Sequence, residues 1–213
     1  MYRNYLKRIL DFILALLAFV MLFPIFTVVT LSLLIANQGK PFFFQERPGL
    51  NERIFKIVKF KSMNDKKDKE GNLLPDADRL TSIGKFVRKT SLDEIPQLLN
   101  IIKGDMSLIG PRPLLPEYLP MYSEKHKKRH NVRPGITGLA QVKGRNTMKF
   151  SERFDNDVFY VDNLSFLLDA RIIFMTINSV LFKSSTIVNG QTVDDIDDLG
   201  ISRNLSSNHF KKK

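Results

Sequence analysis

The sequence predicts an α+β protein with an N-terminal membrane segment, and three observations support this fold class. The segment from Phe12 to Ala36 is almost wholly apolar and has the ~20 residues that a membrane helix needs. Two short stretches typical of strands, at 41–47 and 54–61, flank a turn at Pro48-Gly49 and predict a small β-hairpin. Much of the rest of the 213-residue chain shows helical periodicity, so we expect a mostly helical domain around that hairpin.

The apolar segment has a proline near its centre. Pro24 follows Phe23 and cannot donate a hydrogen bond to the carbonyl of Val20, so a bend is expected. Basic residues, which prefer the cytoplasmic side, lie on both flanks: Arg3, Lys7, Arg8, Lys40, Arg47 and Arg53. A helix–break–helix that enters one leaflet and returns satisfies both flanks, and a kinked span is the alternative, so the residues leave both topologies open. The segment is too long for a signal peptide and lacks a clear small-residue cleavage site.

The composition limits the chemistry. A formal net charge of +11 and a pI of about 9.8 favour anionic partners such as nucleic acid, a membrane surface or phosphorylated substrates. The chain has no cysteine and three histidines, so disulfides, thiolate nucleophiles and cysteine-based zinc sites are excluded. Any bound metal should have oxygen ligands, as Mg²⁺ and Mn²⁺ do. Neither glycine-rich phosphate-binding motif occurs, which argues against a P-loop NTPase or a dinucleotide-binding Rossmann enzyme.

Asp93 and Glu94 form the most informative pair of residues. Pro96 fits only the first turn of a helix, which predicts a helix from about Asp93 to Gly104. Its predicted apolar face comprises Ile95, Leu98, Leu99 and Ile102. The helix dipole would favour the ionised carboxylates, which could act as a nucleophile or as Mg²⁺ ligands. A purely structural capping box between Ser91 and Glu94 is the alternative.

Five basic residues next to turns or at element ends could converge on an anion: Lys59, Arg88, Arg112, Arg133 and Arg145. Arginine binds phosphate oxygens in a bidentate manner, although any one of these residues is more often a solvated surface charge. Arg112 opens a proline-rich stretch, 111–120, that we expect to be an extended loop. Asp105 and Asp157 are further acids that either support the site or cap helices.

The remaining segments complete the predicted organisation. Residues 83–89 are amphipathic and basic, suited to an anionic lipid surface or to a solvated helix. The apolar helix predicted from Leu164 to Phe182 contains Asp169 and Arg171, so we expect a core or interfacial helix rather than a second span. The acidic and polar tail from Ser184 should be loosely ordered. We therefore expect a membrane segment at 1–38, a domain at 39–183 and a tail at 184–213.

Several motifs spread over residues 1–183 point to one family. They include Arg47-Pro48-Gly49-Leu50-Asn51-Glu52, Ser91-Leu92-Asp93-Glu94, Lys103-Gly104-Asp105-Met106-Ser107, Gly110-Pro111-Arg112-Pro113, Arg133-Pro134-Gly135-Ile136-Thr137-Gly138-Leu139-Ala140-Gln141-Val142 and Gly144-Arg145-Asn146. With these motifs the chain resembles the small monotopic polyprenyl-phosphate phosphoglycosyl transferases of the bacterial sugar transferase family. It is especially similar to the PglC branch, which transfers phospho-N,N′-diacetylbacillosamine.

The resemblance implies specific roles for residues in this sequence. A re-entrant helix broken at Phe23-Pro24 would anchor a catalytic domain on the cytoplasmic face of the bacterial inner membrane. Asp93 and Glu94 would be the catalytic pair and would bind Mg²⁺, with Mn²⁺ as the alternative. The residues expected to bind substrate are Lys59, Arg88, Arg112, Arg133, Gln141, Arg145 and Asp157. The family's break usually reads Ser-Pro, so Phe23 is a departure, and Lys143 and the acidic tail also depart from the branch.

The implied reaction transfers a sugar 1-phosphate from a UDP-sugar to undecaprenyl phosphate and releases UMP through a covalent phosphoryl-sugar aspartate. The expected donor is UDP-N,N′-diacetylbacillosamine or a related amino sugar. This would be the first membrane step of glycoconjugate assembly, with membrane lipids and downstream glycosyl transferases, but no nucleic acid, as partners. Two other classes stay open: a non-catalytic, membrane-anchored basic module, and a glycosyl transferase that releases UDP.

Overall fold

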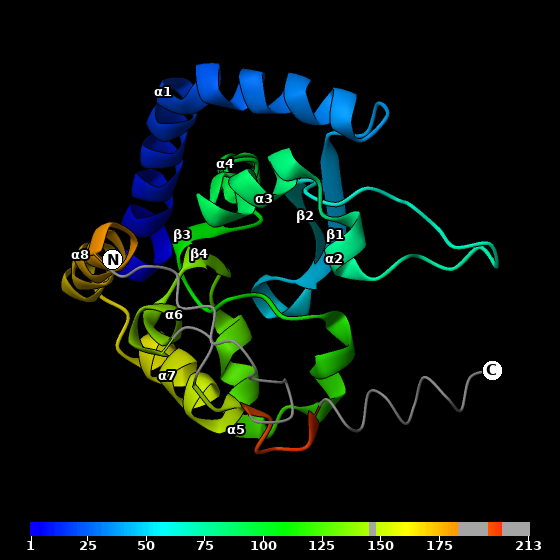
Figure 1. The fold of residues 1–213 in the computed structure, drawn as a ribbon. Helices are drawn as coiled ribbons and strands as arrows, with labels where there is room; N and C mark the ends of the chain where they lie inside the picture. Colours follow the sequence, from blue (N-terminus) through cyan, green and yellow to red (C-terminus); the bar gives the residue numbers. More distant parts are fainter. Residues whose placement is uncertain (145–147, 183–195, 202–213) are drawn as a thin grey trace. The chain divides into compact units, whose positions relative to one another are not determined.

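A computed structural model of the chain describes residues 1–144, 148–182 and 196–201 (Figure 1). The chain divides into two compact units. Unit 1 comprises Met1–Ile9, Glu46–Phe55 and Asp105–Lys213, and unit 2 comprises Leu10–Gln45 and Lys56–Gly104. Strands β1 (Phe42–Pro48) and β2 (Ile54–Phe60) pair in a two-stranded sheet and are joined through the short 3-10 helix η2 (Leu50–Glu52). The predicted hairpin is therefore confirmed.

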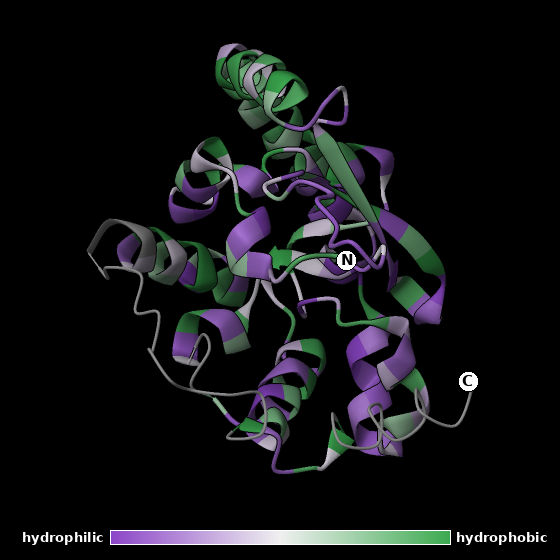
Figure 2. Ribbon diagram, turned by 45° about the vertical axis from the view of Figure 1, so that its right-hand side comes forward, coloured by the Kyte–Doolittle hydropathy of each residue, from purple (hydrophilic) through white to green (hydrophobic). Residues whose placement is uncertain are grey.

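The N-terminal segment is one continuous helix. A π-helical turn, η1 (Tyr2–Leu6), leads into α1 (Lys7–Ala36). Among the described residues, Tyr2–Ala36 is the one helix that is long and apolar enough to cross a membrane, with a mean hydropathy of 2.8 over its most apolar window. Only 11% of that window is buried, unlike the core helix of a soluble protein, and Figure 2 shows its hydrophobic colouring. These properties fit a membrane segment.

Helix α1 bends part-way along its length (Figure 1), and Pro24 lies inside it. The hydroxyl of Thr27 donates a hydrogen bond of 2.9 Å to the carbonyl of Phe23, and Thr30 donates one of 2.7 Å to the carbonyl of Phe26. Threonine hydroxyls bonded to the carbonyl four residues earlier often accompany helix bends. Both bonds lie just after Pro24, in a helix that has phenylalanine, not serine, at position 23.

Aromatic packing supports the second half of α1 within unit 2. The ring of Phe26 lies 5.3 Å from that of Phe60 and 5.8 Å from that of Phe42, between ring centroids. Phe42 and Phe60 stack at 5.6 Å, one from each strand of the hairpin. Because such ring pairs add to the free energy of burial, they hold α1 against this end of the sheet.

The rest of unit 2 consists of short helices. These are α2 (Asp76–Arg79), α3 (Ser82–Lys89), the 3-10 turn η3 (Leu92–Glu94) and α4 (Gln97–Lys103). Helix α3 begins with a side-chain cap, since the Thr81 hydroxyl accepts a hydrogen bond of 2.9 Å from the amide of Gly84. It buries Val87 and leaves Phe86 exposed, as the amphipathic pattern predicts.

Unit 1 contains a second small sheet and most of the helices. Strands β3 (Ser107–Ile109) and β4 (Gly135–Thr137) run parallel, with Ser107 opposite Gly135. A Cβ at Gly135 would lie 2.1 Å from the backbone nitrogen of Gly110, so the close approach of these two backbone segments requires glycine. The helices of unit 1 are η4 (Pro116–Met121), α5 (Glu124–Lys127), η5 (Lys128–Asn131), α6 (Leu139–Gly144), α7 (Phe150–Asp162) and α8 (Phe166–Phe182).

One loop prediction in unit 1 was wrong in part. We expected residues 111–120 to be extended throughout, but a 3-10 helix begins at Pro116. Proline fits this first position because the first amide of a helix has no intrahelical partner. The main core cluster of unit 1 consists of Ile109, Val132, Leu139, Val142, Tyr160, Val161 and Ile172.

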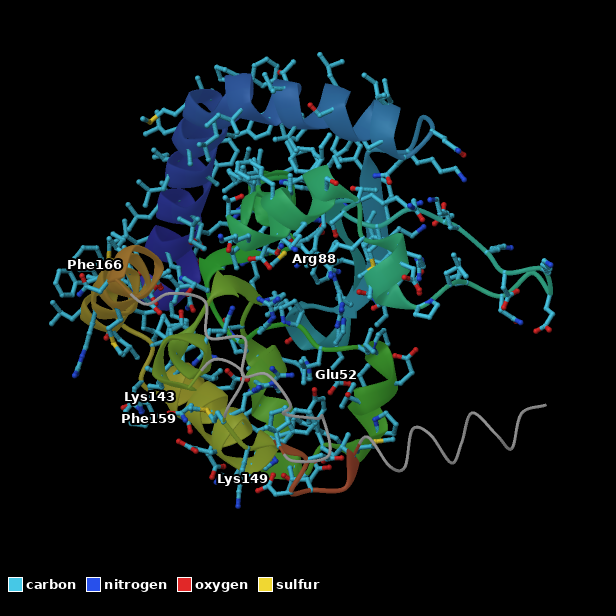
Figure 3. All side chains as sticks on the ribbon, in the orientation of Figure 1. Glu52, Arg88, Lys143, Lys149, Phe159 and Phe166 are labelled. Carbon is cyan, nitrogen blue, oxygen red and sulfur yellow. The ribbon has the colours of Figure 1, made fainter. Side chains whose placement is uncertain are left out.

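Helix α8 contains a buried acid. The carboxylate of Asp169 accepts hydrogen bonds from Lys7 Nζ (2.8 Å), Tyr2 OH (2.6 Å) and Tyr160 OH (2.8 Å). The opposite face of α8 is apolar and exposed, and Phe166 at its start, labelled in Figure 3, is 56% exposed. One buried and one exposed apolar face agree with a core or interfacial helix.

A short segment near the C-terminus packs on α7. Ile201 is 3% exposed and lies in an aromatic cluster with Tyr122, Phe150 and Phe154. Helix α7 has no side-chain cap at Lys149, and the Asp198 carboxylate accepts hydrogen bonds from the amide (3.1 Å) and the hydroxyl of Ser151 instead. Residues 196–201 are thus packed, contrary to our expectation of a loose tail, while 184–195 and 202–213 lie outside the described residues.

Candidate active site

The two carboxylates lie in a 3-10 turn rather than at the start of an α-helix. The amides of Glu94 and Ile95 bond to the carbonyls three residues earlier, of Ser91 (3.3 Å) and Leu92 (3.1 Å). Helix α4 starts only at Gln97, with Pro96 as its N-cap. The amides of Leu98 and Leu99 also bond to carbonyls three residues earlier, those of Ile95 (3.0 Å) and Pro96 (3.1 Å), so the 3-10 pattern continues into the start of α4. The helix start predicted near Asp93 was therefore wrong, whereas Gly104 ends the helix as predicted, with a φ of 103°.

The apolar face of α4 also differs from the prediction. Ile95 and Leu98 are buried as expected, but Ile101 is fully buried and Leu99 is 38% exposed. The 3-10 path has about three residues per turn, so it changes the rotational phase at which α4 begins. A face calculated with 3.6 residues per turn from Asp93 therefore includes Leu99, which is exposed, and omits Ile101, which is buried.

The capping box does not form. Ser91 makes no side-chain hydrogen bond at this helix start, and its backbone is left-handed with a φ of 57°. Serine rarely adopts this conformation, which costs ~1–2 kcal/mol for a residue with a Cβ. Strained backbone of this kind tends to occur at functional sites. The structural alternative for the acid pair is therefore weakened.

Lys59 on β2 joins the acid pair within unit 2. Its Nζ lies 2.7 Å from Glu94 Oε1 and 3.8 Å from Asp93 Oδ2. The three side chains are 18–23% exposed, so the charges are partly desolvated but still reachable from solvent. Sequence reasoning placed these three residues in one site, and the structure brings them together.

Burial shifts the protonation of Asp93. It raises the pKa of the Asp93 carboxyl above its ordinary value, and the Lys59 ammonium is the main opposing cause. Glu94 raises this pKa further, and the exposed guanidinium of Arg88 lowers it. Arg88 lies at the end of α3 (Figure 3), with its Nη2 3.9 Å from Met63 Sδ. Lys59 and Arg88 therefore both favour the ionised, nucleophilic form of Asp93.

Asn100 ties the helix that follows the acids to the strand that carries Lys59. Its Oδ1 accepts a hydrogen bond of 3.0 Å from the amide of Val58, and its Nδ2 donates one of 2.8 Å to the carbonyl of Lys56. Asn100 is 3% exposed. Sequence reasoning missed this residue, although an asparagine inside an apolar helical stretch was a visible anomaly.

In unit 1, three consecutive carbonyls of the loop around Arg112 each accept a hydrogen bond. The amide of Gly135 donates to Pro111 (3.0 Å), Arg129 Nη2 donates to Arg112 (2.7 Å), and Arg47 Nη1 donates to Pro113 (3.4 Å). Burial and then the charge of Arg112 lower the pKa of Arg47. These three hydrogen bonds therefore hold the carbonyl groups of residues 111–113, and with them the backbone of Arg112, in place.

The other predicted substrate ligands of unit 1 have varied surroundings. Asp157 is 2% exposed and paired with Arg129, whose Nη2 lies 2.7 Å from Asp157 Oδ2. Gln141 donates to the carbonyl of Ile136 (2.8 Å), and its buried Oε1 has no hydrogen-bond partner. Arg133 is half-buried between η5 and β4. Arg145 lies outside the described residues, and the binding roles of all four stay predictions.

The described residues hold no group of three or more histidine or acidic side chains that could bind a metal ion. By themselves, Asp93 and Glu94 offer two adjacent carboxylates. Two carboxylates are enough for Mg²⁺, which usually keeps several waters and takes further oxygen ligands from substrate phosphates. The residues present therefore fit a Mg²⁺ ion that is completed by a phosphorylated substrate.

Comparison with known proteins adds an independent line of support. The profile of the family described as "Bacterial sugar transferase" matches residues 2–183. The chain is 50% identical over 179 residues to the uncharacterized sugar transferase EpsL of Bacillus subtilis, covering 83% of this chain and 87% of that protein. It is 37% identical over 191 residues to the exopolysaccharide production protein ExoY of Sinorhizobium fredii, covering 82% of this chain and 84% of that protein.

A third relative has a name that states its reaction. The UDP-glucose:undecaprenyl-phosphate glucose-1-phosphate transferase of Klebsiella pneumoniae is 36% identical over 181 residues. The match covers 80% of this chain but only 39% of that longer protein.

Proposed function

This chain belongs to the bacterial sugar transferase family, and from that premise we propose that it transfers a sugar 1-phosphate from a UDP-sugar to undecaprenyl phosphate, releasing UMP. One family member is named for a transfer of this kind and supports the substrates. The observation that carries the proposal is the Lys59–Asp93–Glu94 arrangement, in which two partly desolvated carboxylates of one short turn lie beside the ammonium of Lys59 on β2. A non-catalytic basic module would not need it.

In the proposed mechanism Asp93 is the nucleophile. An Asp93 oxygen bonds to the sugar-bearing phosphorus while the bond from that phosphorus to the UMP oxygen breaks, so UMP leaves with the electron pair. A phosphate oxygen of undecaprenyl phosphate then attacks the same phosphorus and releases the Asp93 carboxylate. The acceptor phosphate is largely dianionic at neutral pH, with a second pKa of ~6, so a strong base is not required.

The geometry favours Asp93 over Glu94 for this role. Glu94 is hydrogen-bonded to Lys59 at 2.7 Å, whereas Asp93 lies 3.8 Å from the same ammonium. The Asp93 oxygens are therefore less committed to the cation, and a less solvated carboxylate is a better nucleophile. Glu94 in turn holds Lys59 where its charge can stabilise the phosphoryl group.

We propose that Asp93 and Glu94 also hold Mg²⁺, which would neutralise charge on the donor diphosphate. Arg112, on its fixed backbone, is proposed to bind a phosphate through its guanidinium fork. Lys59 and Arg88 add positive charge beside Asp93 and so stabilise charge that develops in the transition state.

The donor sugar is a separate proposal. The resemblance to the PglC branch favours UDP-N,N′-diacetylbacillosamine or a related amino sugar, whereas one relative is named for glucose 1-phosphate. Lys143 and the acidic tail depart from that branch. We therefore propose only that the donor is a UDP-sugar, and the assay varies the sugar of that donor.

The membrane topology we propose is a re-entrant α1, with the catalytic residues on the cytoplasmic face of the inner membrane. The bend in α1, Pro24 inside it and the basic residues on both flanks support a dip into one leaflet. The chain has no cysteine, so single cysteines at Tyr2 and Lys40 can be probed in spheroplasts with an impermeant thiol reagent. We expect neither to react until the membrane is permeabilised, and labelling of position 2 alone from outside would establish a spanning helix.

The reaction is tested with the full-length protein in detergent, undecaprenyl phosphate, Mg²⁺ and a panel of UDP-sugars. We expect UMP as the nucleotide product, and we expect a chelator to stop its release. Asp93→Asn should lose several orders of magnitude in rate because a neutral amide cannot attack phosphorus. Asp78→Asn, the same substitution at an exposed acid of unit 2, is the matched control. UDP as the product, or near-normal turnover in Asp93→Asn, contradicts the proposal.

A further inference from the structure

Arg129 is a buried arginine with every side-chain nitrogen hydrogen-bonded. Its Nε and Nη2 donate to Asp157 Oδ2 at 3.1 and 2.7 Å, and its Nη1 donates to the hydroxyl of Tyr122 at 2.7 Å. The guanidinium lies 5.2 Å from the ring centroid of Phe154 and 5.3 Å from that of Tyr122. Arg129 is 2% exposed. Its position is therefore set by two polar partners and two aromatic rings.

The environment keeps this buried group charged. Burial by itself lowers the pKa of Arg129, but the oxygens of Tyr122 and Asp157 outweigh burial and raise this pKa above its ordinary value. Both of these polar partners also come from unit 1. The cluster is thus a permanently charged donor at a fixed place.

Stability alone does not explain why the chain has this cluster. A buried ion pair is often no more stabilising than apolar side chains of similar volume. What an apolar residue could not provide is the fourth hydrogen bond of Arg129, from Nη2 to the carbonyl of Arg112 at 2.7 Å. The cluster therefore ends at the backbone of a residue that we propose as a phosphate ligand.

The loop needs donors from elsewhere. Arg112 lies between Pro111 and Pro113, neither of which has an N–H. The loop can make few backbone hydrogen bonds of its own, and its orientation depends on what its carbonyls accept. Arg129 supplies the donor for the central carbonyl, the one that belongs to Arg112 itself.

We propose that Arg129, oriented by Asp157 and Tyr122, is a positioning residue that fixes the backbone of Arg112 and so aims its guanidinium at the substrate phosphate. This inference rests on the proposed function. It gives Asp157 an indirect part in substrate binding, through Arg129 rather than by contact. Arg129 makes four hydrogen bonds from three nitrogens spread over a planar fork, which the single ammonium nitrogen of lysine does not reproduce, so lysine should not replace it.

The test is a double-mutant cycle on UMP release by the full chain. Arg129→Lys keeps the charge and removes the fork, and it is measured alone and in an Arg112→Ala background. We expect Arg129→Lys alone to lower kcat/KM at least tenfold, mostly through a higher KM for the UDP-sugar. In the Arg112→Ala background its effect should shrink to less than twofold. Arg53→Lys, the same substitution at an exposed residue of unit 1, should change nothing.

The possible results are distinguishable. A wild-type protein that releases no UMP with any donor counts against the proposed function, and the positioning role is then tested by the hydrogen-exchange measurement below, which does not require activity. With an active wild type, equal losses from Arg129→Lys in both backgrounds overturn the positioning role, because a general structural defect does not depend on Arg112.

A second measurement does not require activity and covers the case in which Arg129→Lys unfolds. Tyr122→Phe keeps the aromatic ring and removes one hydrogen bond from Arg129. Amide hydrogen exchange is compared between this variant and wild type over the peptide from Ile109 to Leu114. We expect at least threefold faster exchange at the amides of Arg112 and Leu114. Unchanged exchange there means that Arg129 does not hold the loop and overturns the inference.

Discussion

Replacing Asn100 with aspartate tests whether the link between β2 and α4 holds the candidate site together. Asn100→Asp keeps the oxygen that accepts from Val58 but replaces the amide that donates to the carbonyl of Lys56. The variant loses one hydrogen bond, worth about 1 kcal/mol, and leaves a buried carboxylate oxygen facing a carbonyl oxygen. Adding about 1–3 kcal/mol for the unsatisfied groups gives a loss on the order of 2–4 kcal/mol at pH 7.

The sign of the pH dependence is a further check on this prediction. Once protonated, the new carboxyl can donate to the Lys56 carbonyl, so its pKa in the folded protein lies above its value in the unfolded chain. Such a group stabilises the fold fully below the unfolded pKa and loses that contribution as the pH rises through the folded pKa. The variant should therefore lie closest to wild type in acid and furthest from it at neutral pH.

Thermal unfolding of the detergent-solubilised protein, followed by circular dichroism, measures the effect. A loss of this size lowers Tm on the order of 5–15 °C for a chain of this length. Asn131→Asp, the same substitution at an exposed residue, should stay within about 2 °C of wild type. An Asn100→Asp variant that melts with wild type at pH 7, or whose deficit is the same at pH 5 and pH 7, would refute the role of this hydrogen bond.

Three further predictions concern stability. At Ser91, whose φ is 57°, glycine should be tolerated without loss and alanine should be less stable than glycine by about 1 kcal/mol in thermal melts; equal stability of the two variants would argue against strain. Burial, and next the charge of Arg129, lower the pKa of His130 to about 4. The unfolded chain therefore binds a proton that the folded protein does not, and stability should fall by about 3 kcal/mol as the pH drops from 6.5 to 4. Urea unfolding should show this loss in wild type and a smaller one in His130→Gln, and identical pH profiles would contradict it. Lys7→Met leaves the buried Asp169 carboxylate without its cation and should cost about 3–5 kcal/mol, much of which Lys7→Met/Asp169→Leu should restore; a double variant as unstable as the single one would count against the pair.

Local patterns in the sequence predicted the parts of the fold that depend on local chemistry. The apolar run around Pro24, the hairpin at Pro48-Gly49 and the helix end at Gly104 follow from length, turn residues and backbone freedom. Asp93 and Glu94 were expected to share a site with Lys59, and the structure places them together.

What the sequence could not predict depends on partners distant along the chain. Arg129 lies in a basic stretch where several cations look alike, and only its contact with Asp157, 28 residues away, distinguishes it. Asn100 is likewise defined by backbone groups more than 40 residues earlier. The buried face of α4 was mispredicted for another reason. The choice between a 3-10 and an α-helical turn at Leu92–Glu94 depends on packing as well as on local preference.

The division of the chain into two units has a consequence for the order of events during protein synthesis. Unit 2, which holds the bent part of α1 and the acid pair, is complete once Gly104 has been made. Unit 1 closes later, because Lys7 pairs with Asp169, 162 residues further on. At ~5–20 residues per second, the ribosome needs roughly 10–30 s to extend the chain from Lys7 to Asp169. The membrane helix and the acid pair can thus fold on the nascent chain before Asp169, the partner of Lys7, has been synthesised.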